Sequence, residues 1–172
     1  MFILLRAARA LGSGVRSKQT ILGAIGALIF GVGGDSMTGK VFALMVHDRT
    51  HPCETLKPVL RRLGVDTFSV SSCVEAARLL DQTEPHLLFT DTMLPDGTWI
   101  DVLNLAEDAA APICTILVGT SKDPELLQAA LNYGAFDCLS PPFDVEEVSE
   151  LLHRAMLLVR AGRERHARAA VA

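Results

Sequence analysis

The sequence has 172 residues, of which 49% are hydrophobic and 21% are charged, and its formal net charge at pH 7 is −4. This length is enough for one domain with a sizeable core and short appendages. Residues 37–159 contain 8 basic and 18 acidic residues, which argues against a nucleic-acid-binding body, because phosphate backbones are bound mainly by lysine and arginine.

The N-terminal segment, residues 1–38, differs in composition from the rest. Four basic residues precede an apolar run from Ile21 to Val32, and this run is shorter than the ~20 residues that a membrane-spanning helix needs. We interpret the leader as a dispensable extension or a start-site artefact, with a membrane anchor through residues 21–34 or a signal peptide as alternatives. A compact domain would naturally begin at Met37, so we expect a chain that starts there to melt at the same temperature as the full chain.

The four cysteines show no CxxC spacing and no companion histidine pairs. The pattern therefore supports neither a zinc site nor a redox dithiol. Cys114 and Cys138 lie in apolar runs and are interpreted as small buried hydrophobic residues. A cytoplasmic protein is expected.

From residue 41 onward, short apolar runs alternate with helical segments. The first run, VFALMV, is continuous, which is typical of a strand buried on both faces of a parallel sheet. The pattern predicts five strands, at residues 41–46, 66–70, 86–90, 113–118 and 137–140.

Capping signals predict where the early helices begin and end. The first helix is expected to begin near Thr55, with Pro58 in its first turn, or else to be kinked at that proline. Gly64 is expected to stop it. The stretch from Ser72 to Glu75 predicts a capping box for the second helix.

The later helices carry similar signals. Thr98, Asp123 and Asp144 are each placed to cap a helix that follows them. The last helix is expected to end near Arg160, which leaves residues 161–172 as a basic, frayed tail. The expected body of the protein is therefore residues 39–160.

Five strands that alternate with five helices predict an α/β fold, in which helices cover both faces of a five-stranded parallel sheet. Ligands of such sheets bind beyond the carboxyl ends of the strands. Asp48, Asp91 and the pair Gly119 and Thr120 all follow predicted strands and are expected at that edge.

The carboxylate of Asp91, which ends the apolar run HLLFT, has two explanations. It can simply cap the following turn, as aspartate often does. With Asp48 beside it, however, two carboxylates would share one crevice, and a hard divalent cation such as Mg²⁺ would relieve their repulsion. A carboxylate so placed can also act as a nucleophile toward a phosphoryl donor.

Three motifs indicate a family: VHD after the first strand, LLFTDTMLPDGTW around the third, and GAFDCLSPPF at the fifth. Through them the body of the chain resembles the receiver domain of bacterial two-component response regulators. The resemblance implies a flavodoxin-like (βα)5 fold and a phosphoacceptor at Asp91, phosphorylated by a histidine kinase. It also implies Mg²⁺ held by Asp91, Asp48 and the backbone carbonyl of Met93, in a loop shaped by Pro95 and Gly97.

The resemblance is incomplete at the site. The family usually has two acids after the first strand, and His47, expected to be partly exposed, replaces the first of them. The hydroxyl residue that contacts the phosphoryl group falls on Gly119, with Thr120 adjacent. Pro141 stands where the family has its phosphoryl-clamping lysine, and Cys138 stands at the aromatic switch position. We therefore expect weak Mg²⁺ binding and a muted conformational response.

Two functions fit these features. The first is a stand-alone receiver domain in phosphorelay signal transduction, with a sensor histidine kinase or phosphotransfer protein as donor. Its output would pass to an unknown downstream protein or through a homodimer, because no DNA-binding domain is expected after the last helix. The alternative is an interaction module of the same fold that works without phosphorylation.

An enzyme is not expected. A phosphatase of the haloacid dehalogenase type would need an acid/base residue where Met93 stands. The stretch HDRTHPCE is a poor loop for the phosphate of a flavin.

Overall fold

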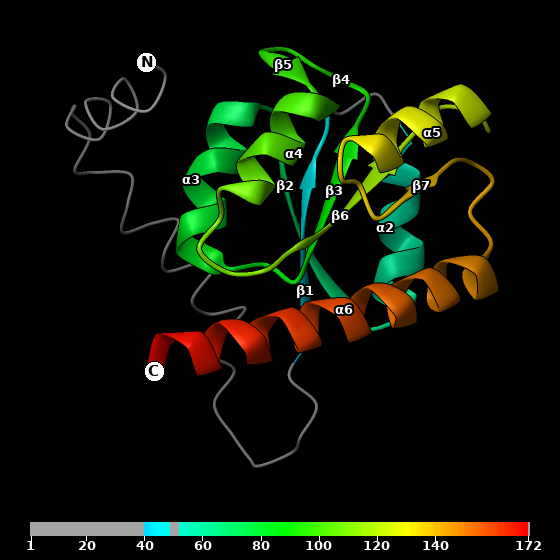
Figure 1. The fold of residues 1–172 in the computed structure, drawn as a ribbon. Coiled ribbons are helices and arrows are strands. Elements are labelled where there is room, and N and C mark those ends of the chain that lie inside the picture. The colour runs from blue at the N-terminus through cyan, green and yellow to red at the C-terminus, as the bar shows by residue number, and fades with distance from the viewer. Residues whose placement is uncertain (1–39, 49–51, 172) are drawn as a thin grey trace. The chain divides into compact units, whose positions relative to one another are not determined.

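The computed structural model describes residues 40–48 and 52–171, which belong to one compact unit, Gly39–Ala172 (Figure 1). The predictions for the leader, including the alternative of a membrane anchor through residues 21–34, lie outside the described residues. No helix in the described part of the chain is both long enough and apolar enough to cross a membrane.

Apart from a short hairpin after the third strand, strands and helices alternate along the described chain, as predicted. The elements are β1 (Val41–Val46), α2 (Cys53–Arg62), β2 (Val65–Val70), α3 (Cys73–Thr83), β3 (Leu87–Asp91), β4 (Met93–Leu94), β5 (Gly97–Thr98), α4 (Trp99–Glu107), β6 (Cys114–Val118), α5 (Pro124–Asn132), β7 (Asp137–Leu139) and α6 (Val145–Val171).

Five of the strands form one parallel sheet in the order β2-β1-β3-β6-β7, which confirms the predicted architecture. Strand β3 lies in the middle. It pairs with β1 as far as Thr90 and with β6 as far as Asp91. The hairpin of β4 and β5, which the sequence patterns did not predict, follows β3 directly.

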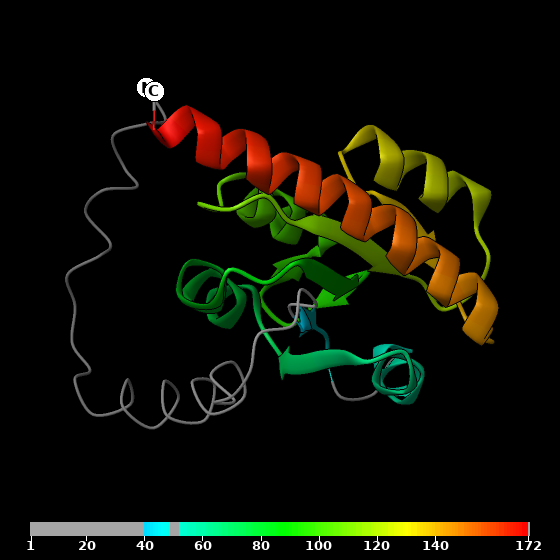
Figure 2. The ribbon, with the colours of Figure 1, turned by 90° about the horizontal axis from the view of Figure 1, so that it is seen from below.

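Helices cover both faces of this sheet. On one face, Met45, Leu87 and Phe89 pack in the largest core cluster with residues of α2 and α6. On the other face, Leu117 packs with residues of α4 and α5. Figure 2 shows α6 crossing the domain as one continuous helix, coloured orange to red.

Most capping predictions are confirmed. At the start of α3, Ser72 Oγ accepts a hydrogen bond from the N–H of Glu75 at 3.2 Å. The Glu75 carboxylate in turn accepts from the N–H of Ser71 at 3.0 Å, one residue earlier than the predicted box. Asp123 accepts from two N–H groups in the first turn of α5, and Asp144 accepts from one in α6.

Two helix boundaries differ from the predictions. Helix α2 begins at Cys53, so Pro58 lies inside the helix, which rules out the first of the two predicted alternatives, a start near Thr55 with Pro58 in the first turn. Helix α6 continues to Val171, well beyond the expected end near Arg160.

Arg163 accounts for part of the extra length of α6, because it fastens the helix to the amino-terminal edge of the sheet. Its Nε donates to the carbonyl of Pro112 at 3.3 Å, and its Nη2 donates to the carbonyls of Glu84 and Pro85, each at 2.7 Å. Gly162 permits this close packing, since a Cβ there would lie 3.0 Å from the Cβ of Pro112. The helix therefore does not fray at the predicted point.

Candidate functional site

Asp91 is the last residue of β3, and its side chain is buried, with 2% exposure. Successive residues of a strand point to opposite faces, so Asp91 lies on the same face as Leu87 and Phe89, which pack toward α2. Its partner in β6 is Val118. A carboxylate therefore stands at the carboxyl end of the middle strand, beside the first turn of α2.

The first residue of α2, Cys53, lies against this carboxylate. Burial raises the pKa of its thiol well above the ordinary value, and the charge of Asp91 and a hydrogen bond to Asp91 raise it further. The thiol therefore lies beside the carboxylate. Sequence analysis missed this contact, because a single cysteine in a first turn carries no signal of its own.

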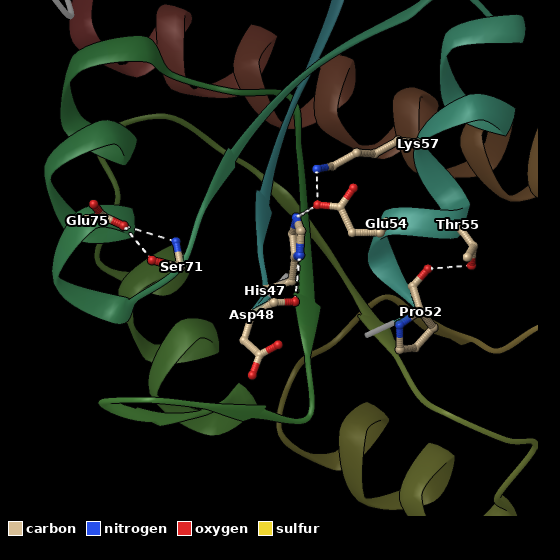
Figure 3. Close-up of polar contacts among 8 residues, drawn as sticks. All are labelled: His47, Asp48, Pro52, Glu54, Thr55, Lys57, Ser71 and Glu75. Atoms are coloured by element: carbon tan, nitrogen blue, oxygen red, sulfur yellow. Dashed lines mark hydrogen bonds and ion pairs between the residues drawn. The ribbon is translucent and has the colours of Figure 1, made fainter. Parts of the chain in front are cut away.

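The other residues of the expected metal site follow β1 and β3. Asp48 is two residues beyond β1, and the pairing of β1 with β3 brings that segment to the same edge as Asp91. The Asp48 carboxylate points away from α2 (Figure 3). Met93 begins β4, two residues after Asp91.

These donors fit a hard cation. Two carboxylates and one backbone carbonyl form an all-oxygen set of the kind that Mg²⁺ takes in proteins, with waters in the remaining positions. Within residues 40–48 and 52–171, no group of three or more His, Cys, Asp and Glu side chains could hold a metal ion. The expected set has only two such side chains, those of Asp48 and Asp91, together with a backbone carbonyl.

His47 is buried, with 2% exposure, so the expectation that it is partly exposed was wrong. It lies on the α2 side of its strand, two residues after Met45. Its Nδ1 lies 3.0 Å from the carbonyl of Asp48 and carries the proton of that contact, because a carbonyl can only accept. Its Nε2 lies 3.6 Å from Oε1 of Glu54 but makes no hydrogen bond to any described residue, and that carboxylate oxygen accepts from Lys57 Nζ at 2.6 Å (Figure 3). His47 therefore packs between the end of β1 and the start of α2.

The residues expected to contact a phosphoryl group lie at the ends of β6 and β7. Gly119 donates its N–H to the carbonyl of Leu139 at 2.8 Å, which holds the two strand ends together. Thr120 follows it and is exposed. Cys138 is partly exposed within β7, so the expectation that it is buried was wrong. Pro141, at the position of the family's lysine, forms a cis peptide bond with the next proline and has no cationic group to offer.

The Pro-Asp-Gly turn after Asp91 is fastened to α3. Burial opposes ionisation of Asp96, but hydrogen bonds from the N–H groups of Cys73 and Val74, at 2.8 and 3.1 Å, outweigh it and hold the pKa of Asp96 below its ordinary value. A Cβ on Gly97 would lie 2.9 Å from the Cys73 sulfur and 2.9 Å from Asp101 Oδ2. The close approach explains why glycine is needed here.

The profile of the response regulator receiver domain matches residues 43–153. The chain belongs to this family. It is thus a receiver domain of two-component signalling, as the three sequence motifs predicted.

Curated relatives of this receiver include full response regulators. The response regulator protein PilR of Pseudomonas aeruginosa is 34% identical over 118 residues, which are 67% of this chain and 26% of PilR. The transcriptional regulatory protein DpiA of Escherichia coli K12 is 28% identical over 120 residues, which are 69% of this chain and 53% of DpiA. The chain therefore spans about a quarter of one relative and about half of the other.

Solved receiver domains share the fold of this one. The signal receiver domain of an HD domain-containing protein from Pseudomonas fluorescens Pf-5 matches with a TM-score of 0.65 and 22% identity, over 78% of this chain and 99% of that one. The receiver domain of the sensor histidine kinase PA1611 from P. aeruginosa PAO1, solved with a magnesium ion in its active site cleft, matches with a TM-score of 0.59 and 19% identity, over 67% and 97%.

Proposed function

We propose that this receiver accepts a phosphoryl group on Asp91, with Mg²⁺ held by Asp91, Asp48 and the carbonyl of Met93. The observation that carries the proposal is the buried Asp91 carboxylate at the carboxyl end of the middle strand. The family match supports a sensor histidine kinase or a phosphotransfer protein as the donor. All four cysteines are free thiols, which supports a cytoplasmic location.

The chemistry at Asp91 is a phosphoryl transfer. A carboxylate oxygen attacks phosphorus, the bond to the donor breaks, and an acyl phosphate remains on the side chain. When bound, Mg²⁺ would offset the negative charge of the carboxylates and the phosphoryl oxygens. Because Asp91 is 2% exposed, we expect the surrounding loops to open before a donor can reach it.

We further propose that phosphorylation changes the rest of the domain only weakly. Pro141 supplies no ammonium group, and the contact that a lysine would make is worth about 1.5–3 kcal/mol. Gly119 supplies no hydroxyl, which leaves Thr120 as the nearest replacement. Cys138 supplies no aromatic ring. The first two substitutions remove groups that would contact the phosphoryl oxygens, and the third removes the aromatic switch.

The second candidate function is an interaction module of the same fold that works without phosphate. The contacts of His47 favour it. At a position where the family has an acid, His47 faces Glu54 at 3.6 Å, so the site has one carboxylate fewer to attract a metal ion.

A paired experiment separates the two functions. The full chain is incubated with acetyl phosphate and Mg²⁺, and intact mass detects the adduct while amide exchange follows residues 120–150. We expect an adduct that disappears in Asp91→Asn and persists in the matched control Asp96→Asn, with little change in exchange. No adduct at any Mg²⁺ concentration would favour the phosphate-independent module. A large change in amide exchange on phosphorylation would contradict weak coupling. Thr120 and Ser121 would then be the first candidates for a residue that contacts the phosphoryl group in place of the lysine.

Mg²⁺ binding is tested separately through the fluorescence of Trp99, which begins α4 near the site. Asp48→Asn should weaken the binding of Mg²⁺. His47→Asp should tighten it, most clearly together with Glu54→Gln, which removes the carboxylate that would repel the new one. If the affinity for Mg²⁺ is unchanged in the chain that carries both His47→Asp and Glu54→Gln, position 47 does not face the metal.

A further inference from the structure

Helix α6 carries an exposed stripe whose charge reverses along the helix. At 3.6 residues per turn, eight exposed residues fall within a sector of about 100°. This α6 stripe consists of Glu147, Glu150, Arg154, Leu157, Leu158, Ala161, Arg165 and Arg168. The buried residues of the helix, among them Val148 and Ala155, lie on the other side.

The α6 stripe is acidic at its start, apolar in its middle and basic at its end. Leu157 and Leu158 in the middle are each 55% exposed, unlike most large apolar side chains of a folded domain. Within the part of the chain that the structure describes, no ion pair is recorded for the two glutamates or for the last two arginines of the stripe. Their charges are therefore available to a partner.

We propose that a second copy of this chain binds the α6 stripe, with the two α6 helices antiparallel. A two-fold axis that passes between Leu157 and Leu158 places Leu157 of each copy against Leu158 of the other. Seven residues outward from the axis, Glu150 then faces Arg165, and ten residues outward Glu147 faces Arg168. Because a two-fold interface repeats every contact, the arrangement makes each of these ion pairs twice.

The remaining stripe residues fit this arrangement. Arg154 faces Ala161 of the second copy, so no like charge opposes it. Within its own chain Arg154 already binds Asp137, with Nη2 2.9 Å from Oδ2, and lies over the ring of Phe136 at 5.6 Å. It therefore forms the edge of the interface next to β7.

The stripe is held in position before any partner binds. Arg163 and Gly162 fix the second half of α6 on the domain through the contacts with Pro112 and the neighbouring loop. Little backbone freedom of the helix is left to lose on association, which favours binding, although the exposed charged side chains must still be ordered.

The chemistry of the stripe also sets the orientation and the strength of the dimer. A parallel pair would place glutamates opposite glutamates and arginines opposite arginines, which repel. One pair of helices about 40 Å long covers an area near the low end for specific protein interfaces. We therefore expect weak association that salt suppresses, because exposed charges are screened over about 10 Å at 0.1 M ionic strength.

Charge reversal provides the test, by sedimentation velocity of the full chain in reducing buffer. The wild-type chain should form a dimer at low salt, and the dissociation constant of this dimer should be at least about tenfold higher near 0.5 M salt. Reversing only the acidic end (Glu147→Arg with Glu150→Arg) or only the basic end (Arg165→Glu with Arg168→Glu) should give monomers. Reversing both ends in one chain should restore the dimer, which only an antiparallel arrangement predicts.

Matched controls identify the surface. Leu157→Glu should abolish the dimer, whereas Leu131→Glu, at an apolar side chain of α5 that is 43% exposed, should leave it intact. Circular dichroism melting checks that each variant is folded. A chain that stays monomeric at low salt, or a dimer that is lost in Leu131→Glu but kept in Leu157→Glu, would overturn the proposal. A monomeric chain with both ends reversed would overturn the antiparallel orientation.

Discussion

Replacing Arg163 by alanine should destabilise the domain by about 2–3 kcal/mol. The guanidinium donates three hydrogen bonds to carbonyls of two loops. A bond from a charged donor contributes about 1.5–3 kcal/mol when buried, and because Arg163 is partly exposed we assign about 1 kcal/mol to each. For a domain of this size the loss corresponds to a fall in melting temperature of roughly 6–12 °C.

Urea denaturation followed by circular dichroism measures this loss, at high salt so that association through the α6 stripe does not contribute. Arg165→Ala is the matched control, since Arg165 donates only to the carbonyl of Ala161 in its own helix, at 3.2 Å. It should cost less than about 0.5 kcal/mol. Equal losses in the two variants would refute the view that Arg163 fastens α6 to the sheet.

Three other substitutions test local features. Burial lowers the pKa of His86, and the charges of two arginines in α6 lower it further. In the unfolded chain this histidine has a pKa of about 6.5, so as the pH falls the unfolded state binds the proton first. The contribution of neutral His86 to folding stability is therefore complete above that pH and is lost as the pH falls below it. His86→Asn, whose Oδ1 can replace Nδ1 as the acceptor for the N–H of Phe42, should flatten the dependence of the urea midpoint on pH between 5 and 7.5. Gly97→Ala should lower the free energy of unfolding by about 1–2 kcal/mol, because its Cβ would lie 2.9 Å from two side-chain atoms; thermal melting at the wild-type temperature would contradict this. Asp96→Ala should lower the free energy of unfolding by about 1 kcal/mol at neutral pH, because the helix cap is lost. The difference from the wild type should shrink as the pH falls through the lowered pKa of Asp96, because the wild-type cap is then protonated as well. A difference that does not vary with pH would argue against an ionised cap.

The sequence predicted the sheet because its signals are local. Continuous apolar runs mark strands buried on both faces, and the strands at Val41–Val46 and Leu87–Asp91 lie within one residue of their predicted limits. Caps such as Asp123 also act on the next few residues, so short stretches of sequence are enough to identify them. The position of Asp91 at the sheet edge followed from this alternation.

The contacts that were missed join residues far apart in the chain. His47 is buried because α2 covers its side of β1, and Cys53 meets Asp91 only after β1, β3 and α2 have packed. The extension of α6 depends on carbonyls near Glu84 and Pro112, about 50 to 80 residues away in sequence. Local composition, which is basic and polar there, predicted a frayed tail.

Because Cys53 lies against Asp91, the reactivity of its thiol reports how accessible the Asp91 carboxylate is to solvent. The thiol is fully buried, so an alkylating reagent can reach it only while the first turn of α2 is lifted from the carboxylate. Cys73 and Cys138, which are partly exposed, would react without that movement. The alkylation rate of Cys53 would therefore measure how often the carboxylate becomes reachable, with no label or probe introduced into the chain.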